Sequence, residues 1–313
     1  MSKKMKWIQV FKCICAVLLI SVFLTGCGNN NTVVDTTDDF SYDDSDTVYD
    51  YEENGFVEEE GSLLDDFAFA FALPDLDGKR LIVLMDQQGV NSPERIDFAI
   101  SQTGAQIDIR YIGYQEGDID AFNYRDMSYN FDVMSGHIYE VISGEVEVDE
   151  THFICSYNQF SNAIIPFNSM FDKWMWEFEP ASAGAIAKAV SIKNRAVEYG
   201  NRIAYAQYGD LEVNQFKYVR IGDDMLFSII CSEGSKDIVL DFPAEYDEYS
   251  TWRVDGGEDP GNINIVFLAR IDDKLVMATV WGAPEGESAS IWVEENGKLI
   301  DAGLDAYRYW SPF

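Results

Sequence analysis

The feature that most constrains this fold is a run of eight strand-length segments between residues 201 and 301. Each segment is rich in β-branched and aromatic residues, and the breaks between them are short and turn-like. The last break, Asn296-Gly297, is a strong signal for a two-residue hairpin. Consecutive hairpins form an antiparallel sheet, so we predict a meander of strands over residues 203–208, 215–221, 225–231, 237–242, 264–270, 275–281, 289–294 and 298–301.

The segment before this sheet predicts a strand, a helix and a second strand. Residues 79–85 are a dense apolar run of strand length. Ser92-Pro93-Glu94 supplies an N-cap residue and a proline for the first helical turn, and Gly104 supplies a stop. Residues 107–111 then alternate between apolar and polar, as in a half-buried strand. The loop at 86–91 lacks the glycines of a phosphate-binding loop, so we expect it to be structural.

Three short strands and one helix are expected between residues 137 and 200. The strands are predicted at 137–143, 145–148 and 152–156. The helix follows Pro180, has an alanine-rich body, and ends with basic residues before Gly200, which suits the helix dipole. We therefore expect an α+β fold. It would have an N-terminal strand-helix-strand portion, a central Ala-rich helix and a C-terminal antiparallel meander, in one globular domain (67–313). The two portions would either share one core or form two lobes, 67–178 and 179–313.

The first residues of the chain have the pattern of a secretion signal. Lysines at positions 3, 4, 6 and 12 precede an apolar run at 13–24. Leu24-Thr25-Gly26-Cys27, at the end of that run, resembles the lipobox of bacterial lipoproteins. The resemblance covers only residues 1–28. It implies that a signal peptide (1–26) is removed before a Cys27 that carries a diacylglycerol.

The resemblance places the mature protein on the outer face of a bacterial cell membrane. Two acyl chains, such as palmitate, on Cys27 are enough for stable anchoring. The alternative is an uncleaved signal anchor. A spanning helix needs roughly 20 apolar residues, so it would have to place Lys12 inside the bilayer, at a cost of about 2.5 kcal/mol or more.

An acidic linker follows the lipobox. Residues 28–66 contain fourteen Asp and Glu and no Lys or Arg. A segment of this composition cannot bury enough apolar area to offset its ordering entropy, so we expect residues 27–66 to be a disordered stalk. Residues 67–313 still carry 41 acidic and 18 basic side chains. This charge argues against nucleic acid and anionic lipid surfaces as partners, and leaves cationic peptides, divalent ions and neutral glycans.

Two acidic stretches are candidates for calcium, namely Asp75-Leu76-Asp77-Gly78 and residues 255–259. Neither has the spacing of an EF-hand loop, because position six of the second stretch is Pro260, where that loop needs Gly. We expect both to be plain turns, and we expect no metal site and no cofactor.

The cysteines offer little for catalysis. Cys13 and Cys15 leave with the signal, so Cys155 and Cys231 are the thiols of the domain. His152 is three residues from Cys155, on the opposite face of a strand, and is poorly placed to activate it. The two cysteines either form one disulfide or lie in the core as free thiols.

Two groups of aromatic residues are the candidate ligand-binding residues. In an extended segment Trp174, Trp176 and Phe178 share one face, and Tyr246, Tyr249 and Trp252 would make a stripe on a short helix after Pro243. Such faces can bind a sugar ring or a peptide, but large aromatics on one face more often belong to the core.

We therefore expect a noncatalytic surface lipoprotein that binds a protein, peptide or glycan. Two alternatives remain: a glycosidase-like hydrolase of the cell envelope, and an accessory subunit of a membrane complex. A hydrolase would need two carboxylates about 5–10 Å apart, and Glu177 and Glu179 beside the first aromatic group are the pair to examine. No catalytic residue is assigned.

Overall fold

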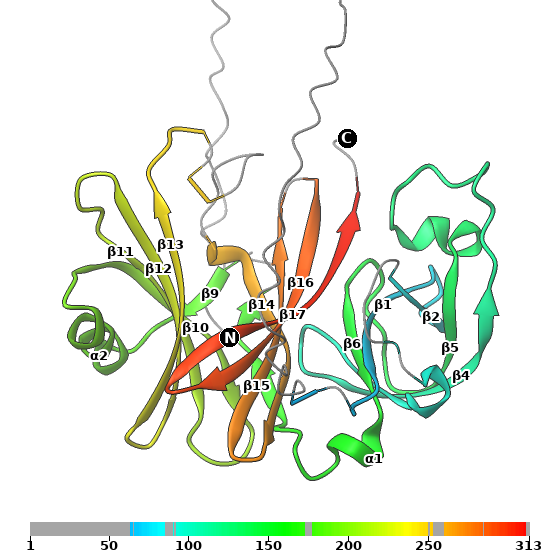
Figure 1. Cartoon of the computed structure of the whole chain (residues 1–313), viewed down its shortest axis with the longest axis horizontal. Coiled ribbons are helices and arrows are strands. Elements are labelled where there is room, and N and C mark those ends of the chain that lie inside the picture. Colours follow the sequence, from blue (N-terminus) through cyan, green and yellow to red (C-terminus); the bar gives the residue numbers. More distant parts are fainter. Residues whose placement is uncertain are drawn as a thin grey trace, which may run out of the picture. The chain divides into compact units, whose positions relative to one another are not determined.

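Strands dominate the computed structural model of the chain, which describes residues 63–64, 66–84, 90, 92–172, 177–249, 251–252, 260–283 and 285–310. These residues contain 17 strands, arranged as a closed six-stranded barrel and one larger sheet (Figure 1). The expected α+β class with a central helix is therefore wrong. The fold is mostly β, because segments expected to be helical or irregular pair as strands.

The first sheet closes on itself in the order β1-β2-β5-β4-β3-β6, and β6 returns to pair with β1. All of its neighbouring strands are antiparallel. The strands are β1 (Phe69–Pro74), β2 (Arg80–Val83), β3 (Phe98–Ile100), β4 (Gln106–Gln115), β5 (Gly136–Ser143) and β6 (His152–Cys155).

The helix expected after Ser92 is absent. Only one 3-10 turn, η1 (Pro93–Arg95), follows Ser92, whose φ of 66° is left-handed and whose side chain caps no backbone N–H. The chain then extends into β3, which pairs with both β4 and β6. Burial of Phe98 and Ile100, at a spacing of two on β3, outweighs the helical start signal, because strand pairing places both residues in the main core. The strand expected at 145–148 is also absent.

Both faces of β1 are buried, and its side chains alternate in size. Ala70 and Ala72 belong to a small cluster with Ile107, Tyr139 and Ile154, which fills the barrel. The phenylalanines at positions 69 and 71 point to the other face and belong to the main core. A six-stranded barrel is narrow, so small residues inside and large residues outside are the arrangement that fits.

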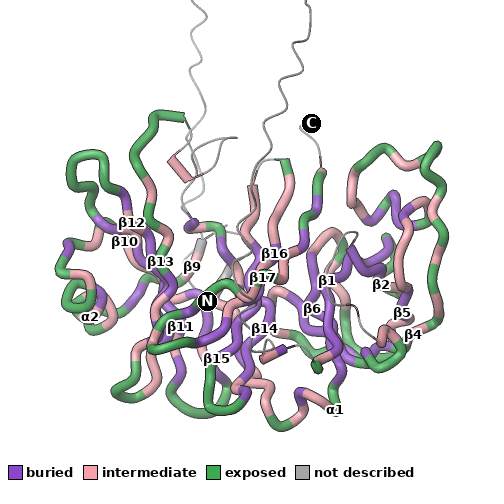
Figure 2. The backbone as a smooth tube through the Cα atoms, in the orientation of Figure 1, coloured by how far each residue is buried: buried purple, intermediate pink, exposed green. Residues whose placement is uncertain are grey.

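The large outer side chains of the barrel pack against the second sheet. The ring of Phe153, on β6, stacks on the ring of Phe267, on β14, with 4.2 Å between centroids. Phe160, in the one-turn helix α1 (Tyr157–Phe160), approaches Phe267 edge-on at 5.3 Å. A continuous band of buried residues links β1 and β6 to β14 (Figure 2). The two sheets therefore share one core.

The second sheet runs in the order β14-β15-β16-β17-β13-β12-β11-β10-β9-β8, with β7 also on β10. Each of the eight strands predicted from residue 203 onward overlaps one of β10 to β17, but the predicted single antiparallel meander is wrong, because β13 pairs in parallel with β17 and not with β14. The strands are β7 (Phe167–Ser169), β8 (Phe171–Asp172), β9 (Glu177–Pro180), β10 (Val197–Ala206), β11 (Glu212–Tyr218), β12 (Asp224–Glu233), β13 (Lys236–Glu245), β14 (Ile263–Ile271), β15 (Lys274–Gly282), β16 (Gly286–Glu295) and β17 (Lys298–Tyr309).

The second sheet is almost closed into a barrel. Two of the contacts that close it consist of few backbone pairs. β13 and β17 are parallel, and their register consists of one pair, Val239 with Lys298. On the other side, the segment 163–169 bridges β14 and β10. Its first residues bond to β14, where the Ile165 N–H donates to the carbonyl of Leu268 at 2.8 Å. Its last residues form β7, which pairs with β10.

The predicted Ala-rich helix exists as α2 (Ala183–Lys193), but it is peripheral. Its N-cap Ser182 accepts a hydrogen bond from the Ala185 N–H, and it ends at a left-handed Asn194 rather than at Gly200. The helix covers the outer face of β11 and β12. Lys188 and Lys193 point to the sheet, where they bond Asp237 and Asp241 at 2.8 and 2.6 Å. The remaining helical turns are η2 (Ser128–Val133) and η3 (Pro260–Asn262).

Removing the ring that joins the two sheets should destabilise both of them. We expect Phe153→Ala to lower the free energy of unfolding by about 3–4 kcal/mol, because it leaves a cavity against Phe267. Urea unfolding checks this. Trp281 and Trp292 lie on β15 and β16, so tryptophan fluorescence reports on the second sheet although the substitution is in the first.

Tyr208→Ala is the control, since Tyr208 is 79% exposed, and it should change stability by less than about 0.5 kcal/mol. A Phe153→Ala protein whose fluorescence transition does not move would contradict the shared core.

Candidate functional site

One end of the second sheet gathers aromatic side chains. In the antiparallel run β10 to β13 and β14 to β17, the ends of β11, β13, β15 and β17 lie at the same end of the sheet. The connection from β13 to β14, residues 246–262, is the longest one there. We call this region the aromatic end, defined by Tyr199, Phe227, Phe242, Trp252, Trp281 and Trp292. The opposite end has tight turns, including 234–235, 272–273 and 296–297.

Phe242 is the centre of this aromatic cluster. Its ring meets the rings of Phe227, Trp281 and Trp292 edge-on, with centroids 6.2, 5.8 and 6.0 Å away. The Trp252 Nε1–H donates to the backbone carbonyl of Phe242 at 3.1 Å. Phe242 and the three tryptophans are only partly buried and pack against the main core. The cluster therefore joins strands that are not neighbours in the sheet.

Polar groups are placed among these rings. The Trp292 Nε1–H donates to Thr279 Oγ1 at 2.9 Å. The Lys217 ammonium lies 5.9 Å from the centroid of the Tyr199 ring and 3.8 Å from a carboxylate oxygen of Glu198. The aromatic end thus holds a cation against an aromatic face, an attraction of about 0.5–1 kcal/mol at an exposed site.

The residues after β13 form a bonded loop rather than the expected helix. Pro243 lies within β13, and the Tyr246 N–H donates to the Asp223 carbonyl at 2.7 Å. The Tyr249 N–H donates to Asp247 Oδ1 at 2.8 Å, and Thr251 Oγ1 donates to the Asp247 carbonyl at 2.6 Å. These bonds hold the loop without a helical turn, so the predicted helical stripe is wrong.

The three aromatics of this loop have separate environments. Tyr246 is 44% exposed, and the Arg220 guanidinium carbon lies 3.9 Å above its ring. Tyr249 is 73% exposed. Trp252 instead packs partly against the core.

The other predicted group is only partly accounted for. Trp174 and Trp176 lie outside the described residues. Phe178, on β9, is partly buried and packs against the main core. The structure therefore brings Phe178 and Trp252 to the same core, and leaves Tyr246 and Tyr249 on the surface.

The sequence analysis missed the centre of the cluster. Phe242 and Trp281 are each the last residue of a predicted strand, at 237–242 and 275–281. Alternate strands of a meander end on the same side, and this rule could have brought the two rings together. Trp292 lies in the middle of its strand and gave no such signal.

Cys155 and Cys231 are separate free thiols, so of the two expected alternatives the structure has the unbridged one. Cys155 is on β6 of the barrel, and Cys231 is on β12 of the second sheet. Burial raises the pKa of Cys155. Burial, and next the charge of Glu294, raise the pKa of Cys231 to about 12. Neither thiol is activated as a nucleophile.

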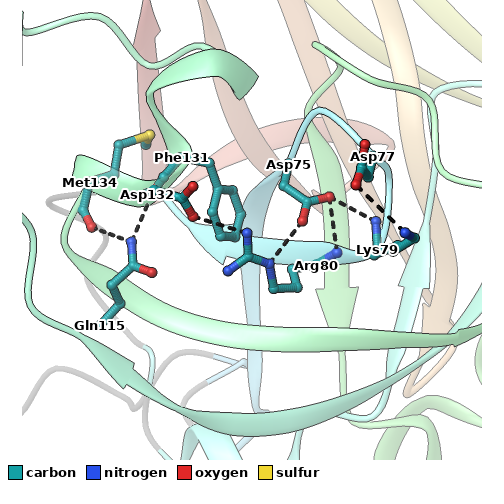
Figure 3. A network of polar contacts seen from close by, with 8 residues as sticks. All are labelled: Asp75, Asp77, Lys79, Arg80, Gln115, Phe131, Asp132 and Met134. Atoms are coloured by element: carbon teal, nitrogen blue, oxygen red, sulfur yellow. Dashed lines mark hydrogen bonds and ion pairs between the residues drawn. The ribbon is translucent and has the colours of Figure 1, made fainter.

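The first calcium candidate is a structural turn. Asp75 accepts hydrogen bonds from the N–H groups of Lys79 and Arg80, and its second oxygen lies 2.8 Å from Arg80 Nε (Figure 3). Arg80 also bonds Asp132 at 3.0 Å and lies over the Phe131 ring. The Asp75 oxygens are thus occupied by protein donors. The second candidate, residues 255–259, lies outside the described residues.

Other chemistry finds little support among the described residues. They contain no group of three or more His, Cys, Asp or Glu side chains placed to hold a metal ion, and no helix long and apolar enough to cross a membrane. Glu179 is exposed and paired with Arg202. Comparisons of the chain with protein-family models, curated proteins and solved structures give no match.

Both thiols should be unreactive in the folded protein. In a chain with Cys13, Cys15 and Cys27 replaced by serine, we expect a thiol reagent at pH 8 to modify neither cysteine, because both are buried and their pKa values are raised. Guanidinium without reductant should then release two thiols. A fast-reacting thiol in the folded chain, or no thiol after unfolding, would contradict this result.

Proposed function

We propose that this protein is a lipid-anchored, noncatalytic binding protein on the outer face of a bacterial cell membrane. Cys27 carries the lipid, the acidic linker 28–66 separates the domain from the membrane, and the aromatic end of the second sheet holds a protein, peptide or glycan ligand. The signal-like first 26 residues and the lipobox support the anchor.

The observation that supports the binding role most strongly is a difference in exposure: Tyr246 and Tyr249 are exposed, whereas the aromatic cluster around Phe242 packs against the core. Tyr246 and Tyr249 are exposed and their backbone N–H groups are hydrogen-bonded, whereas Trp252 donates to the Phe242 carbonyl and packs against the main core. Tyrosine provides an apolar face and a polar tip at low entropic cost. The backbone N–H groups of Tyr246 and Tyr249 are already hydrogen-bonded, so these two residues lose little further entropy when a ligand binds.

The described residues favour binding over catalysis. The two thiols are buried, and Glu179 forms an exposed ion pair with Arg202 instead of lying in an apolar pocket. His152 is buried, with Nδ1 2.9 Å from the carbonyl of Glu150. We therefore keep the hydrolase as the alternative that an assay on cell-wall glycans tests directly.

The anchor depends on one side chain. Cys27→Ser should abolish incorporation of radioactive palmitate and leave residues 1–26 attached, because the lipobox resemblance implies cleavage only before a lipidated Cys27. Cys13→Ser is the control and should leave both readouts unchanged. Labelling that persists in Cys27→Ser, or a mature protein that begins at Met1, would contradict the lipoprotein assignment.

The binding role predicts contact at one end of the sheet. A photoreactive phenylalanine analogue placed at Tyr249 should give a crosslinked product in living cells, whereas the same analogue at Tyr208, 79% exposed in the β10–β11 turn at the opposite end, should not. The mass of the product and the crosslinked position are the readouts. Equal products at both positions, or none at Tyr249, would overturn the assignment of the site.

A further inference from the structure

We propose that the ligand at the aromatic end is a cationic peptide segment rich in Lys or Arg. This inference rests on the proposed function and names the chemistry of its partner. The surface concerned is the acidic tyrosine rim, which we define as Asp223, Asp224, Glu245, Tyr246, Asp247, Glu248 and Tyr249.

The rim is continuous. Asp224 on β12 is the register partner of Glu245 on β13, and the Tyr246 N–H donates to the Asp223 carbonyl. All seven of its residues are exposed. The two strand ends and the loop therefore present five carboxylates and two phenol rings on one surface.

The carboxylates of the rim outnumber its cations. Asp224 is 3.4 Å from Arg195 Nη1. Within the part of the chain that the structure describes, Asp223, Glu245 and Glu248 form no ion pair. These three remain available to a cationic partner, which would approach a domain that already carries a large excess of negative charge.

Cations of the chain itself already occupy aromatic faces at this end. Arg220 lies over Tyr246 at 3.9 Å, and Lys217 lies 5.9 Å from the Tyr199 centroid. These contacts show the geometry that an Arg or Lys side chain adopts here. Tyr249 is the most exposed ring of the rim, at 73%, and offers the next such face beside Glu248 and Asp247.

Charge and aromatic faces together select the ligand class. An anionic peptide would be repelled by the five carboxylates, and a neutral glycan would gain stacking but no charge attraction. A Lys- or Arg-rich segment gains both. Because the carboxylates are exposed, this attraction is screened by salt.

The test measures binding of a fluorescent ten-residue lysine peptide to the full chain carrying Cys27→Ser. We expect binding that weakens as salt is raised, and no binding of a ten-residue glutamate peptide. Tyr249→Ala should weaken the lysine peptide about 2–5-fold, the loss of one exposed cation–π contact. Tyr208→Ala, at the opposite end, should leave the affinity unchanged.

A charge-matched pair of variants separates this site from general attraction. Glu245→Gln with Glu248→Gln should weaken binding and reduce its salt dependence. Asp210→Asn with Asp272→Asn makes the same change in net charge in turns at the opposite end of the sheet, and should have a much smaller effect. Equal effects of the two pairs would overturn the proposal.

The outcome also distinguishes this inference from the proposed function. If the analogue at Tyr249 crosslinks a ligand in cells while the lysine peptide does not bind, the cationic class is wrong and the binding site stands. If the peptide binds but its affinity does not respond to Tyr249→Ala or to the glutamate variants, the aromatic end is not its site and this inference fails.

Discussion

The fold depends on the contact between the outer face of the small barrel and the second sheet. Along β1 the barrel interior accepts only small side chains, so Phe69 and Phe71 lie on the outside of the barrel. The apolar surface that they form there is stable only when it is buried. Phe153 stacked on Phe267 is the centre of the contact that buries this surface. Neither sheet could expose that face alone without a large loss of apolar burial, so both form one folding unit.

A network of polar contacts between the barrel and the second sheet fixes the orientation in which the two pack. Arg308 on β17 is almost fully buried, with Nη2 2.6 Å from the Asp149 carbonyl and Nε 3.4 Å from Glu287. Thr151, just before β6, donates to the same glutamate. Apolar contact is tolerant of small rotations, whereas these bonds hold at one orientation. Removing one partner of such a buried pair would leave a charge without compensation, which is costly.

The sequence predicted strands β10 to β17 and four strands of the barrel, β2, β4, β5 and β6, but it missed β1 and β3, for one physical reason. Within β10 to β13, and again within β14 to β17, the strands follow one another through short turns, so local signals such as Asn296-Gly297 describe them. In the barrel, β1 alternates large with small rather than apolar with polar, and the period of two is hidden. Strand β3 was given a helical start because the pairing that overrides it comes from β4 and β6.

The residues of the candidate site also divide into those that local sequence signals could predict and those that they could not. Tyr246, Tyr249 and Trp252 could be named from their spacing, because all three lie in one connection. The cluster around Phe242 could not be, since its rings come from β12, β13, β15 and β16 and meet only when the sheet curves. Charge totals left cationic peptides, divalent ions and neutral glycans open, and the positions of Glu245 and Glu248 beside exposed tyrosines are what lead us to propose the first of these.

The single parallel pair between Val239 and Lys298 shows what the aromatic cluster does for the fold itself. Closing a chain of about 60 residues costs about 3–4 kcal/mol of conformational entropy, which the net gain of one or two backbone hydrogen bonds, about 1 kcal/mol each, does not offset. The difference must come from side chains that cross the gap, and Phe242 on β13 against Trp281 and Trp292 is such a crossing. Those rings therefore hold β13 to strands beyond β17 and stabilise the closure of the sheet.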